Sequence, residues 1–250
     1  MPDAEAEIAR ARMLGLTAGG FEEIEGPGWV ELAAYTDSAG EESIRATFAE
    51  VSAISVDDDW ADRWREFHQP VRVGGLWIGP PWVRAPSDEP VVVVDPGRAF
   101  GTGAHPTTRA CIELLAGLER GSLFDAGCGS GVVAVAAVRL GFGPVVAADS
   151  DPVAVEVARQ TARLNGVAVV VREADAVRDE LPAADVVVAN IELAVVEALL
   201  ARRPARMCVT SGYLAGERPR VEGWAVVREW KLDGWAAHAL VVADEATDTL

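Results

Sequence analysis

Ser122 to Gly131, Ser-Leu-Phe-Asp-Ala-Gly-Cys-Gly-Ser-Gly, is the stretch that decides the fold. Its apolar first half predicts a strand, and a helix is predicted from Val132 to Leu140. Glycines allow a tight turn and let backbone N–H groups approach a ligand closely. A dinucleotide site would read GxGxxG, whereas here the third glycine comes one residue earlier. The stretch therefore predicts either a ligand-binding loop of another kind or a plain turn between strand and helix.

The chain around this loop alternates between short apolar runs and helical segments. Short apolar strands separated by helices indicate an α/β fold, with a mostly parallel sheet covered on both faces. The predicted strands are 91–95, 122–127, 145–150, 169–174, 185–190 and 207–211. The predicted helices are 106–118, 132–140 and 152–164.

Polar residues end several of these strands, where open α/β sheets bind ligands. Asp149 ends the strand VVAADS, where a carboxylate can accept hydrogen bonds from both hydroxyls of a ribose. The alternative is a helix N-cap, but Asp151 ahead of Pro152 suits that role better. Asn190 ends DVVVAN and can accept a bond from an incoming amine, hold a cofactor, or simply form a turn. Asp175 is placed for an adenine amino group, with a solvated loop acid as the alternative.

Residues 95–111, DPGRAFGTGAHPTTRAC, are a loop rich in glycine and threonine that runs into the predicted helix 106–118. Such a loop offers backbone donors and hydroxyl groups to a ligand. His105, directly before Pro106, is either a general base or a structural residue, and a lone histidine is more often structural.

The first part of the chain predicts a separate small domain over residues 1–57. Its expected order is helix (3–14), strand (21–26), strand (29–36), helix (38–48) and strand (51–56), a small α+β domain lacking one strand at its front. Residues 58–89 are a tryptophan-rich linker whose aromatic side chains either pack two domains together or face a substrate. Residues 90–250 are the expected catalytic domain.

Charge and composition restrict the function further. The formal net charge is −17, and residues 1–66 hold 16 acidic residues against 5 arginines. This charge either keeps the protein in solution or attracts a basic partner, and it disfavours direct nucleic-acid binding. No apolar run is long enough to span a membrane. Three distant cysteines predict neither a disulfide framework nor a metal site, so a reducing cytoplasm fits best.

Several of these segments together resemble a known family. The segments DPGRAFGTGAHPTTR, DAGCGSGVVAVAAVRLG, AADSDPVAVEVARQTARLNGV, DVVVANI and TSGYL are similar to those of the methyltransferases that act on large-subunit ribosomal protein eleven. DDDWADRWREFHQPVRVGGLWIGPPW resembles the linker of that family. The likeness covers roughly residues 15–240, and its AFGTGxHPTT loop is highly specific. It implies a ferredoxin-like substrate-recognition domain followed by a Rossmann-like, seven-stranded class I methyltransferase domain.

The resemblance also implies a cofactor, S-adenosyl-L-methionine, and a basic ribosomal protein as partner, methylated on lysine and α-amino groups. The positions it assigns to cofactor contacts are Thr107, Thr108, Gly127, Asp149 and Asn190, with Phe100, Gly101 and Thr102 lining the pocket near the methyl group. Asp125, Gly129, Gly131 and Asp175 complete the predicted cofactor-binding set. Asn190, Thr102 and His105 are the candidate catalytic residues.

The sequence departs from the family where Asn190 is followed by Ile191-Glu192-Leu193 rather than by Ile-Leu-Ala. Glu192 either attracts a cationic lysine or is a solvated acid at a helix start. Two other readings stay open: the same fold acting on a small molecule or another protein, and a binding module without activity. The glycine loop with Asp149 and Asn190 argues against the binding module.

Overall fold

The structure is a computed structural model that describes residues 9, 12–13, 16–17, 22–26, 29–34, 36, 38–54, 69–95 and 103–243. The chain divides into two compact units, Met1–Asp62 and Arg63–Leu250, and each unit is described by itself. Among the described residues, no helix combines the length and the apolar character that crossing a bilayer requires.

The N-terminal unit contains the predicted hairpin and helix. Strands β1 (Glu22–Gly26) and β2 (Trp29–Ala33) pair antiparallel, with Gly26 opposite Trp29. Helix α2 (Ser38–Thr47) follows, and the Arg45 guanidinium reaches back one turn to the Glu41 carboxylate at 2.8 Å. Both elements begin within one residue of their predicted starts, because Gly-Pro-Gly and Ser38 are strong local signals.

The strand predicted over residues 51–56 is wrong for the four positions that the structure describes. Residues 51–54 have no regular structure, and the Ile54 side chain is 86% exposed. The Val51 carbonyl accepts a hydrogen bond from Arg45 at 3.0 Å instead of joining a ladder. An alternating sequence forms a strand only where a neighbour pairs with it. Among the described residues this unit therefore holds a two-stranded sheet, and its ferredoxin-like arrangement stays a prediction.

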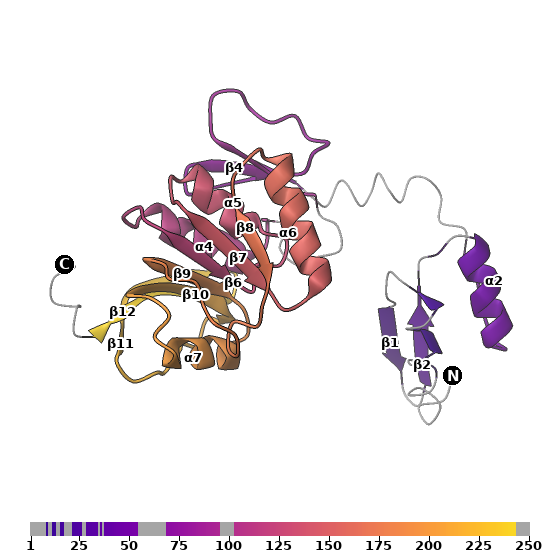
Figure 1. The fold of residues 1–250 in the computed structure, drawn as a ribbon. Helices are drawn as coiled ribbons and strands as arrows, with labels where there is room; N and C mark the ends of the chain where they lie inside the picture. Colours follow the sequence, from indigo (N-terminus) through magenta and orange to yellow (C-terminus); the bar gives the residue numbers. More distant parts are fainter. Residues whose placement is uncertain are drawn as a thin grey trace. The chain divides into compact units, whose positions relative to one another are not determined.

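A seven-stranded sheet organises the C-terminal unit in the order β11-β12-β10-β9-β6-β7-β8 (Figure 1). Its strands are β6 (Leu123–Ala126), β7 (Val145–Asp149), β8 (Val170–Glu173), β9 (Val186–Asn190), β10 (Met207–Leu214), β11 (Trp224–Leu232) and β12 (Trp235–Val242). The five strands from β10 to β8 are parallel, and β12 runs antiparallel to β10 and β11. The predicted α/β fold and the count of seven strands are confirmed, but the strand predicted over residues 91–95 belongs to a separate sheet.

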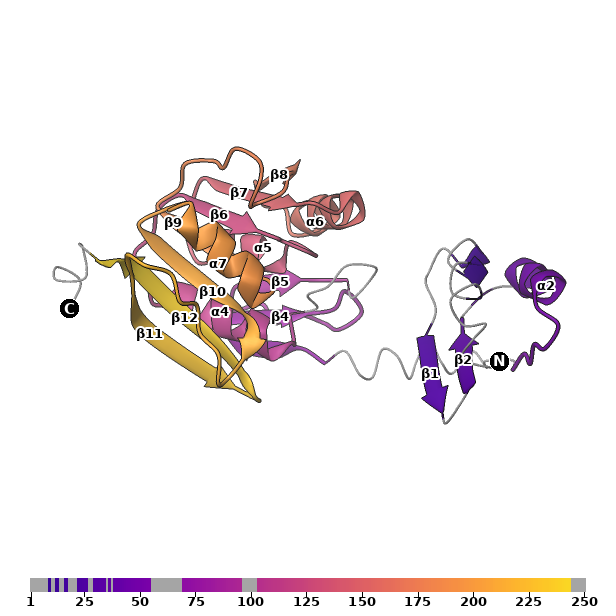
Figure 2. The same ribbon diagram turned by 90° about the horizontal axis from the view of Figure 1, so that it is seen from below.

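Helices cover both faces of this sheet. One buried cluster joins the sheet to α4 (Pro106–Ala116), α5 (Val132–Arg139) and α6 (Pro152–Leu164). A second cluster joins the other face to α7 (Leu193–Ala201), which Figure 2 shows on the side of the sheet away from α4 and α5. The five inner strands, β12, β10, β9, β6 and β7, are mostly buried, which explains their continuous apolar character, whereas the edge strands β8 and β11 are largely exposed.

A second, three-stranded sheet belongs to the same unit. It consists of β3 (Val71–Val73), β4 (Leu76–Gly79) and β5 (Val91–Val93), so part of the predicted linker forms strands here. Asn165 joins this sheet to α6: its Oδ1 accepts from Val93 N at 2.7 Å, and its Nδ2 donates to Val93 O at 2.7 Å. This pairing fixes the strand that leads into the loop before α4.

Strand β11 forms one edge of the seven-stranded sheet. A bulge between Val226 and Arg228 interrupts its pairing with β12. Beyond the bulge, the Glu229 carboxylate forms an ion pair with the Lys231 ammonium at 3.2 Å. Charged side chains and bulges are common on natural edge strands, because they oppose pairing with a foreign strand.

Candidate functional site

The glycine loop between β6 and α5 packs against two neighbouring elements. Gly127 and Gly131 both have positive φ values, +72° and +76°. A Cβ atom on Gly131 would lie 2.9 Å from the Cβ atom of Ala158 on α6, and one on Gly127 would overlap the Ile191 side chain. Glycine is therefore required here both for the left-handed backbone and for close packing.

Asp149, at the end of β7, holds this loop from the neighbouring strand. Its carboxylate is half-buried and accepts hydrogen bonds from Gly129 N at 2.9 Å and from Asp151 N at 3.0 Å. Asp151, rather than Asp149, caps α6 by accepting from Val153 N at 2.8 Å. Each Asp149 oxygen keeps a second lone pair for a ligand.

Asn190 and Thr108 come together from positions 82 residues apart in the chain. Asn190 Nδ2 donates to Thr108 Oγ1 at 3.4 Å, which joins the end of β9 to the first turn of α4. Asn190 Oδ1 is buried and has no hydrogen-bond partner within the part of the chain that the structure describes. A buried acceptor without a donor costs free energy, so this oxygen is a candidate acceptor for a hydrogen bond from a ligand.

His105 caps helix α4. Its Nδ1 lies 2.8 Å from Thr107 Oγ1 and accepts from Thr107 N at 3.4 Å. Burial lowers the pKa of His105. Its ring also meets the Trp235 ring edge-on, with 5.2 Å between the ring centres. The structural role weighed for this histidine is therefore present, and a role as general base stays a prediction.

The two remaining acids make local contacts. Asp125 is buried, and its Oδ2 accepts from Ala134 N at 3.0 Å, below the glycine loop. Burial, opposed by this hydrogen bond and reinforced by the Asp149 charge, raises the pKa of Asp125 to about 7. Asp175 Oδ1 accepts from Val177 N at 2.8 Å and so closes a turn after β8. Asp125 thus joins β6 to the first turn of α5. Asp175 lies one residue beyond Ala174, whose N–H donates to the Asp149 carbonyl.

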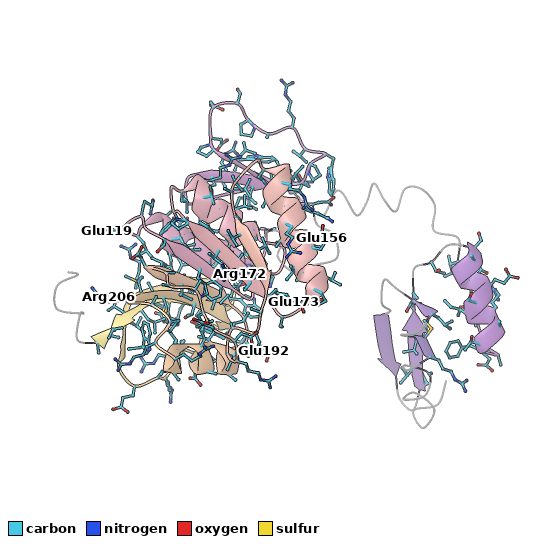
Figure 3. All side chains as sticks on the ribbon, in the orientation of Figure 1. Glu119, Glu156, Arg172, Glu173, Glu192 and Arg206 are labelled. Carbon is cyan, nitrogen blue, oxygen red and sulfur yellow. The ribbon has the colours of Figure 1, made fainter. Side chains whose placement is uncertain are left out.

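Other predicted positions are only partly visible. Phe100, Gly101 and Thr102 lie outside the described residues. Gly103 is described with a φ of +84°, and a Cβ there would overlap Ile78 of β4. Glu192 (labelled in Figure 3) is exposed at the N-terminus of α7, and its side chain makes no capping hydrogen bond.

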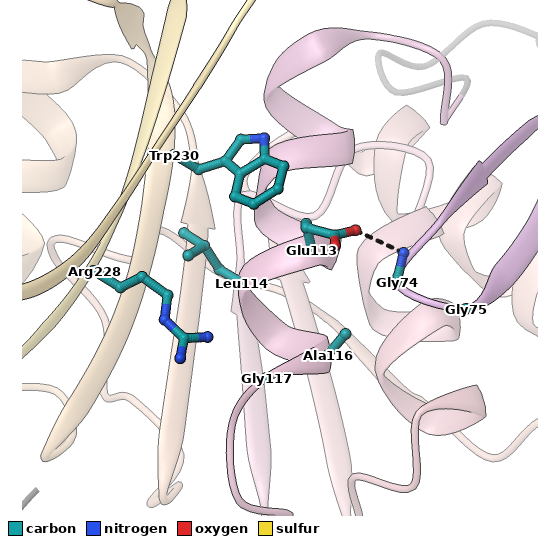
Figure 4. A pocket seen from close by; sticks show the side chains of 8 residues that line it. All are labelled: Gly74, Gly75, Glu113, Leu114, Ala116, Gly117, Arg228 and Trp230. Atoms are coloured by element: carbon teal, nitrogen blue, oxygen red, sulfur yellow. Dashed lines mark hydrogen bonds between the residues drawn. The ribbon is translucent and has the colours of Figure 1, made fainter. Parts of the chain in front are cut away.

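A separate cavity of about 350 Å³ lies toward the other end of α4 (Figure 4). None of the predicted site residues lines it. Its walls are Gly74, Gly75, Glu113, Leu114, Ala116, Gly117, Arg228 and Trp230. Among the described residues, no group of histidine, cysteine and acidic side chains could hold a metal ion. The candidate site is therefore the edge formed by the glycine loop, Asp149, Asn190 and the start of α4.

Sequence reasoning missed Trp235 and the residues that hold β10 at this edge. Trp235 begins β12 and reaches the site only because β12 pairs back along β10, where it lies opposite Leu214. No local pattern indicates that pairing.

Comparison with known proteins agrees with this geometry. A family model described as ribosomal protein L11 methyltransferase (PrmA) matches residues 29–240. A protein of that name from Pelotomaculum thermopropionicum is 42% identical over 179 residues, covering 65% of this chain and 58% of its own length. Its counterpart from Pseudomonas putida strain W619 is 41% identical over 188 residues, covering 71% and 64%. The chain thus spans about three fifths of the length of these curated relatives.

Among solved structures, a ribosomal protein L11 methylase from Lactobacillus delbrueckii subsp. bulgaricus is similar in fold. The TM-score is 0.60 at 25% sequence identity, and the match covers 67% of this chain and 95% of that one.

Proposed function

Because the chain belongs to the ribosomal protein L11 methyltransferase (PrmA) family, we propose that it transfers methyl groups from S-adenosyl-L-methionine to amino groups of ribosomal protein L11. The observation that carries the proposal is the buried Asn190 Oδ1, which has no donor among the described residues and lies where parallel strands end. An incoming amine supplies such a donor.

The residues present fit the cofactor. Gly127 and Gly131 have no side chains, so a ligand can approach the backbone of the loop closely. The Asp149 carboxylate has free lone pairs for two ribose hydroxyls. Asp175 follows Ala174, whose N–H donates to the Asp149 carbonyl, and we assign Asp175 to the adenine group of the cofactor. When bound, S-adenosyl-L-methionine would supply a methyl group attached to a positively charged sulfur, and the neutral thioether S-adenosyl-L-homocysteine would be released.

The chain's own residues then orient the amine and control its charge. An amine attacks only in its neutral form, and a lysine in water is mostly protonated near neutral pH. Burial at the edge of the sheet disfavours the charged form. Asn190 Oδ1 accepts an N–H of the neutral amine, and Thr108 holds the Asn190 amide in that orientation. Alignment of this kind contributes several kcal/mol to a displacement reaction, so no covalent enzyme intermediate is needed.

The N-terminal unit is proposed to recognise the protein substrate as a ferredoxin-like domain. Residues 1–66 carry most of the excess acid, which complements a basic ribosomal protein. Attraction between exposed charges weakens with ionic strength, so binding of the substrate is expected to be salt-sensitive. The three free, buried cysteines agree with a reducing compartment, and we place the reaction in the cytoplasm.

Mass spectrometry of purified ribosomal protein L11, after incubation with the enzyme and S-adenosyl-L-methionine, tests the proposal. Addition of whole methyl masses is expected with the wild-type chain. Asn190→Ala is expected to reduce the rate by about 100-fold, because the amine loses its acceptor. Cys208→Ala, on the same sheet but in its interior, serves as the matched control. If L11 gains no mass while calorimetry detects cofactor binding, L11 is not the substrate and the proposed function is wrong.

A further inference from the structure

A bulge in β10 lies beside Asn190. Pairing with β12 shifts by one residue between Ser211 and Tyr213, and Gly212 at the bulge has a φ of +101°. A Cβ on Gly212 would overlap the Ile191 backbone, and Ile191 N donates to Ser211 O at 3.1 Å. The bulge therefore sets the path of the peptide that follows Asn190.

The Tyr213 hydroxyl holds this bulge from the side facing α7. The side chain is buried, and its Oη lies 2.7 Å from Thr210 Oγ1 and 3.1 Å from the Thr210 carbonyl. These contacts join the two strand segments on either side of the bulge. Oη also lies 3.0 Å from His238 Nδ1. A buried hydroxyl is tolerated only when it is bonded in this way.

His238 connects Tyr213 to the edge of the sheet. It lies opposite Thr210 on β10 and opposite Glu229 on β11, so the contacts cross three strands at one level. His238 Nε2 lies 3.2 Å from the Glu229 carboxylate, which in turn is paired with Lys231. Because a carboxylate only accepts, Nε2 carries the proton of neutral His238, and Nδ1 is an acceptor that faces the Tyr213 hydroxyl. The single proton of that hydroxyl is shared between Nδ1 and the Thr210 carbonyl.

On its C-terminal side, the bulge is connected through β12 to the start of α4, which carries Thr108. Leu214, the residue after Tyr213, pairs with Trp235, and the Trp235 ring contacts His105. His105 caps α4, whose first turn carries Thr108, the partner of Asn190. The bulge thus lies between the two segments that bring Asn190 and Thr108 together.

We propose that Tyr213, fixed by His238 and Glu229, is a positioning residue that sets the orientation of the Asn190 amide through Gly212 and Ile191. The expected effect on kcat rests on the proposed function, whereas the expected effect on the orientation of the Asn190 amide does not. It assigns a role to a hydroxyl that packing alone does not require, because a phenylalanine ring would fill the same space in the cluster under α7.

Tyr213→Phe removes the hydroxyl and keeps the ring. On ribosomal protein L11 we expect kcat to fall about tenfold, because small displacements of an orienting group are costly. The Kd for S-adenosyl-L-methionine is expected to rise by no more than about threefold, since the hydrogen bonds that join Asp149 to the glycine loop and to the start of α6 do not involve the bulge residues. Cys208→Ala removes a buried sulfur from the same strand and is the control for a general loss of packing. An unchanged kcat in Tyr213→Phe would overturn the proposal.

Replacing His238 separates positioning from simple packing. His238→Gln can still accept from Tyr213 and donate to Glu229, whereas His238→Leu can do neither. We expect His238→Gln to keep most of the wild-type kcat and His238→Leu to match Tyr213→Phe. Equal losses in the two His238 variants would count against a role for the His238 hydrogen bonds in fixing Tyr213.

The side-chain amide signals of Asn190 give a readout that does not depend on turnover. In nitrogen-15 spectra these signals are identified by their disappearance in Asn190→Ala. They are expected to shift in Tyr213→Phe and in His238→Leu, and to stay in place in Cys208→Ala. If wild-type enzyme fails to methylate L11, the proposed function falls while this measurement still decides the positioning role. Unmoved Asn190 signals in Tyr213→Phe would refute it.

Discussion

Asp125→Asn should change how the stability of the catalytic unit depends on pH. Asp125 is buried below the glycine loop, and its pKa is raised from 3.8 to about 7. The folded chain therefore holds this proton more tightly than the unfolded chain does. Its contribution to stability is fully present below pH 3.8 and is lost progressively as the pH rises toward 7. Asparagine stays neutral, and its Oδ1 can still accept from Ala134 N.

The size of the effect follows from the two pKa values. A difference of about three pKa units corresponds to roughly 4 kcal/mol in total. Between about pH 5 and about pH 8, the wild type should lose roughly 3 kcal/mol more than Asp125→Asn. Protonation of every other group is common to both proteins and cancels in the comparison. The remaining difference in unfolding free energy therefore comes from Asp125.

Urea-induced unfolding of the full chain, followed by circular dichroism at the two pH values, measures this difference. The Asp125→Asn variant should gain stability relative to wild type as the pH rises. Parallel pH profiles for the two proteins would show that Asp125 is already ionised in the folded state, and the burial argument would be refuted.

Three further substitutions test the site and its supports. Asp149→Asn should weaken cofactor binding by roughly 10- to 100-fold in calorimetry, because the amide turns one acceptor into a donor facing a backbone N–H; unchanged affinity would show that the ribose lies elsewhere. Gly131→Ala should cost about 2–4 kcal/mol in thermal unfolding, from the positive φ and from crowding against Ala158; a normal melting temperature would contradict this. Asn165→Ala should cost roughly 3 kcal/mol, since both backbone groups of Val93 lose their partner, and a loss under about 0.5 kcal/mol would mean that water replaces the amide.

Local signals predicted the parallel strands from β6 to β10 and helices α4, α5 and α6 closely, whereas α7, β11 and β12 were not predicted. Helix α6 runs from Pro152 to Leu164 as expected, because Asp151 caps it and the proline fixes its first turn. The polar residues Asp149 and Asn190 end their strands as expected, because apolar runs in parallel strands stop where the sheet meets solvent.

Contacts between distant segments were beyond such reasoning. Thr108 and Asn190 were both predicted as site residues, but only the packing of α4 against the sheet brings their side chains into contact. Tyr213 lay in a quoted motif with no role, because its partner His238 is reached by an antiparallel return strand. The strand predicted around Ile54 was wrong because strand formation also depends on a distant partner. Its local pattern is favourable, but residues 51–54 pair with no strand among the described residues.

Lys231, the lysine paired with Glu229 on β11, affects the design of any methylation assay of this enzyme. Lys231 is the single lysine of the whole chain. It stands on the outermost strand, 3.2 Å from the Glu229 carboxylate. An enzyme proposed to methylate lysines thus offers one such side chain of its own, and a Lys231→Arg variant would remove it while keeping the charge. Methyl label found on lysine in a mixture with that variant would come from the substrate alone.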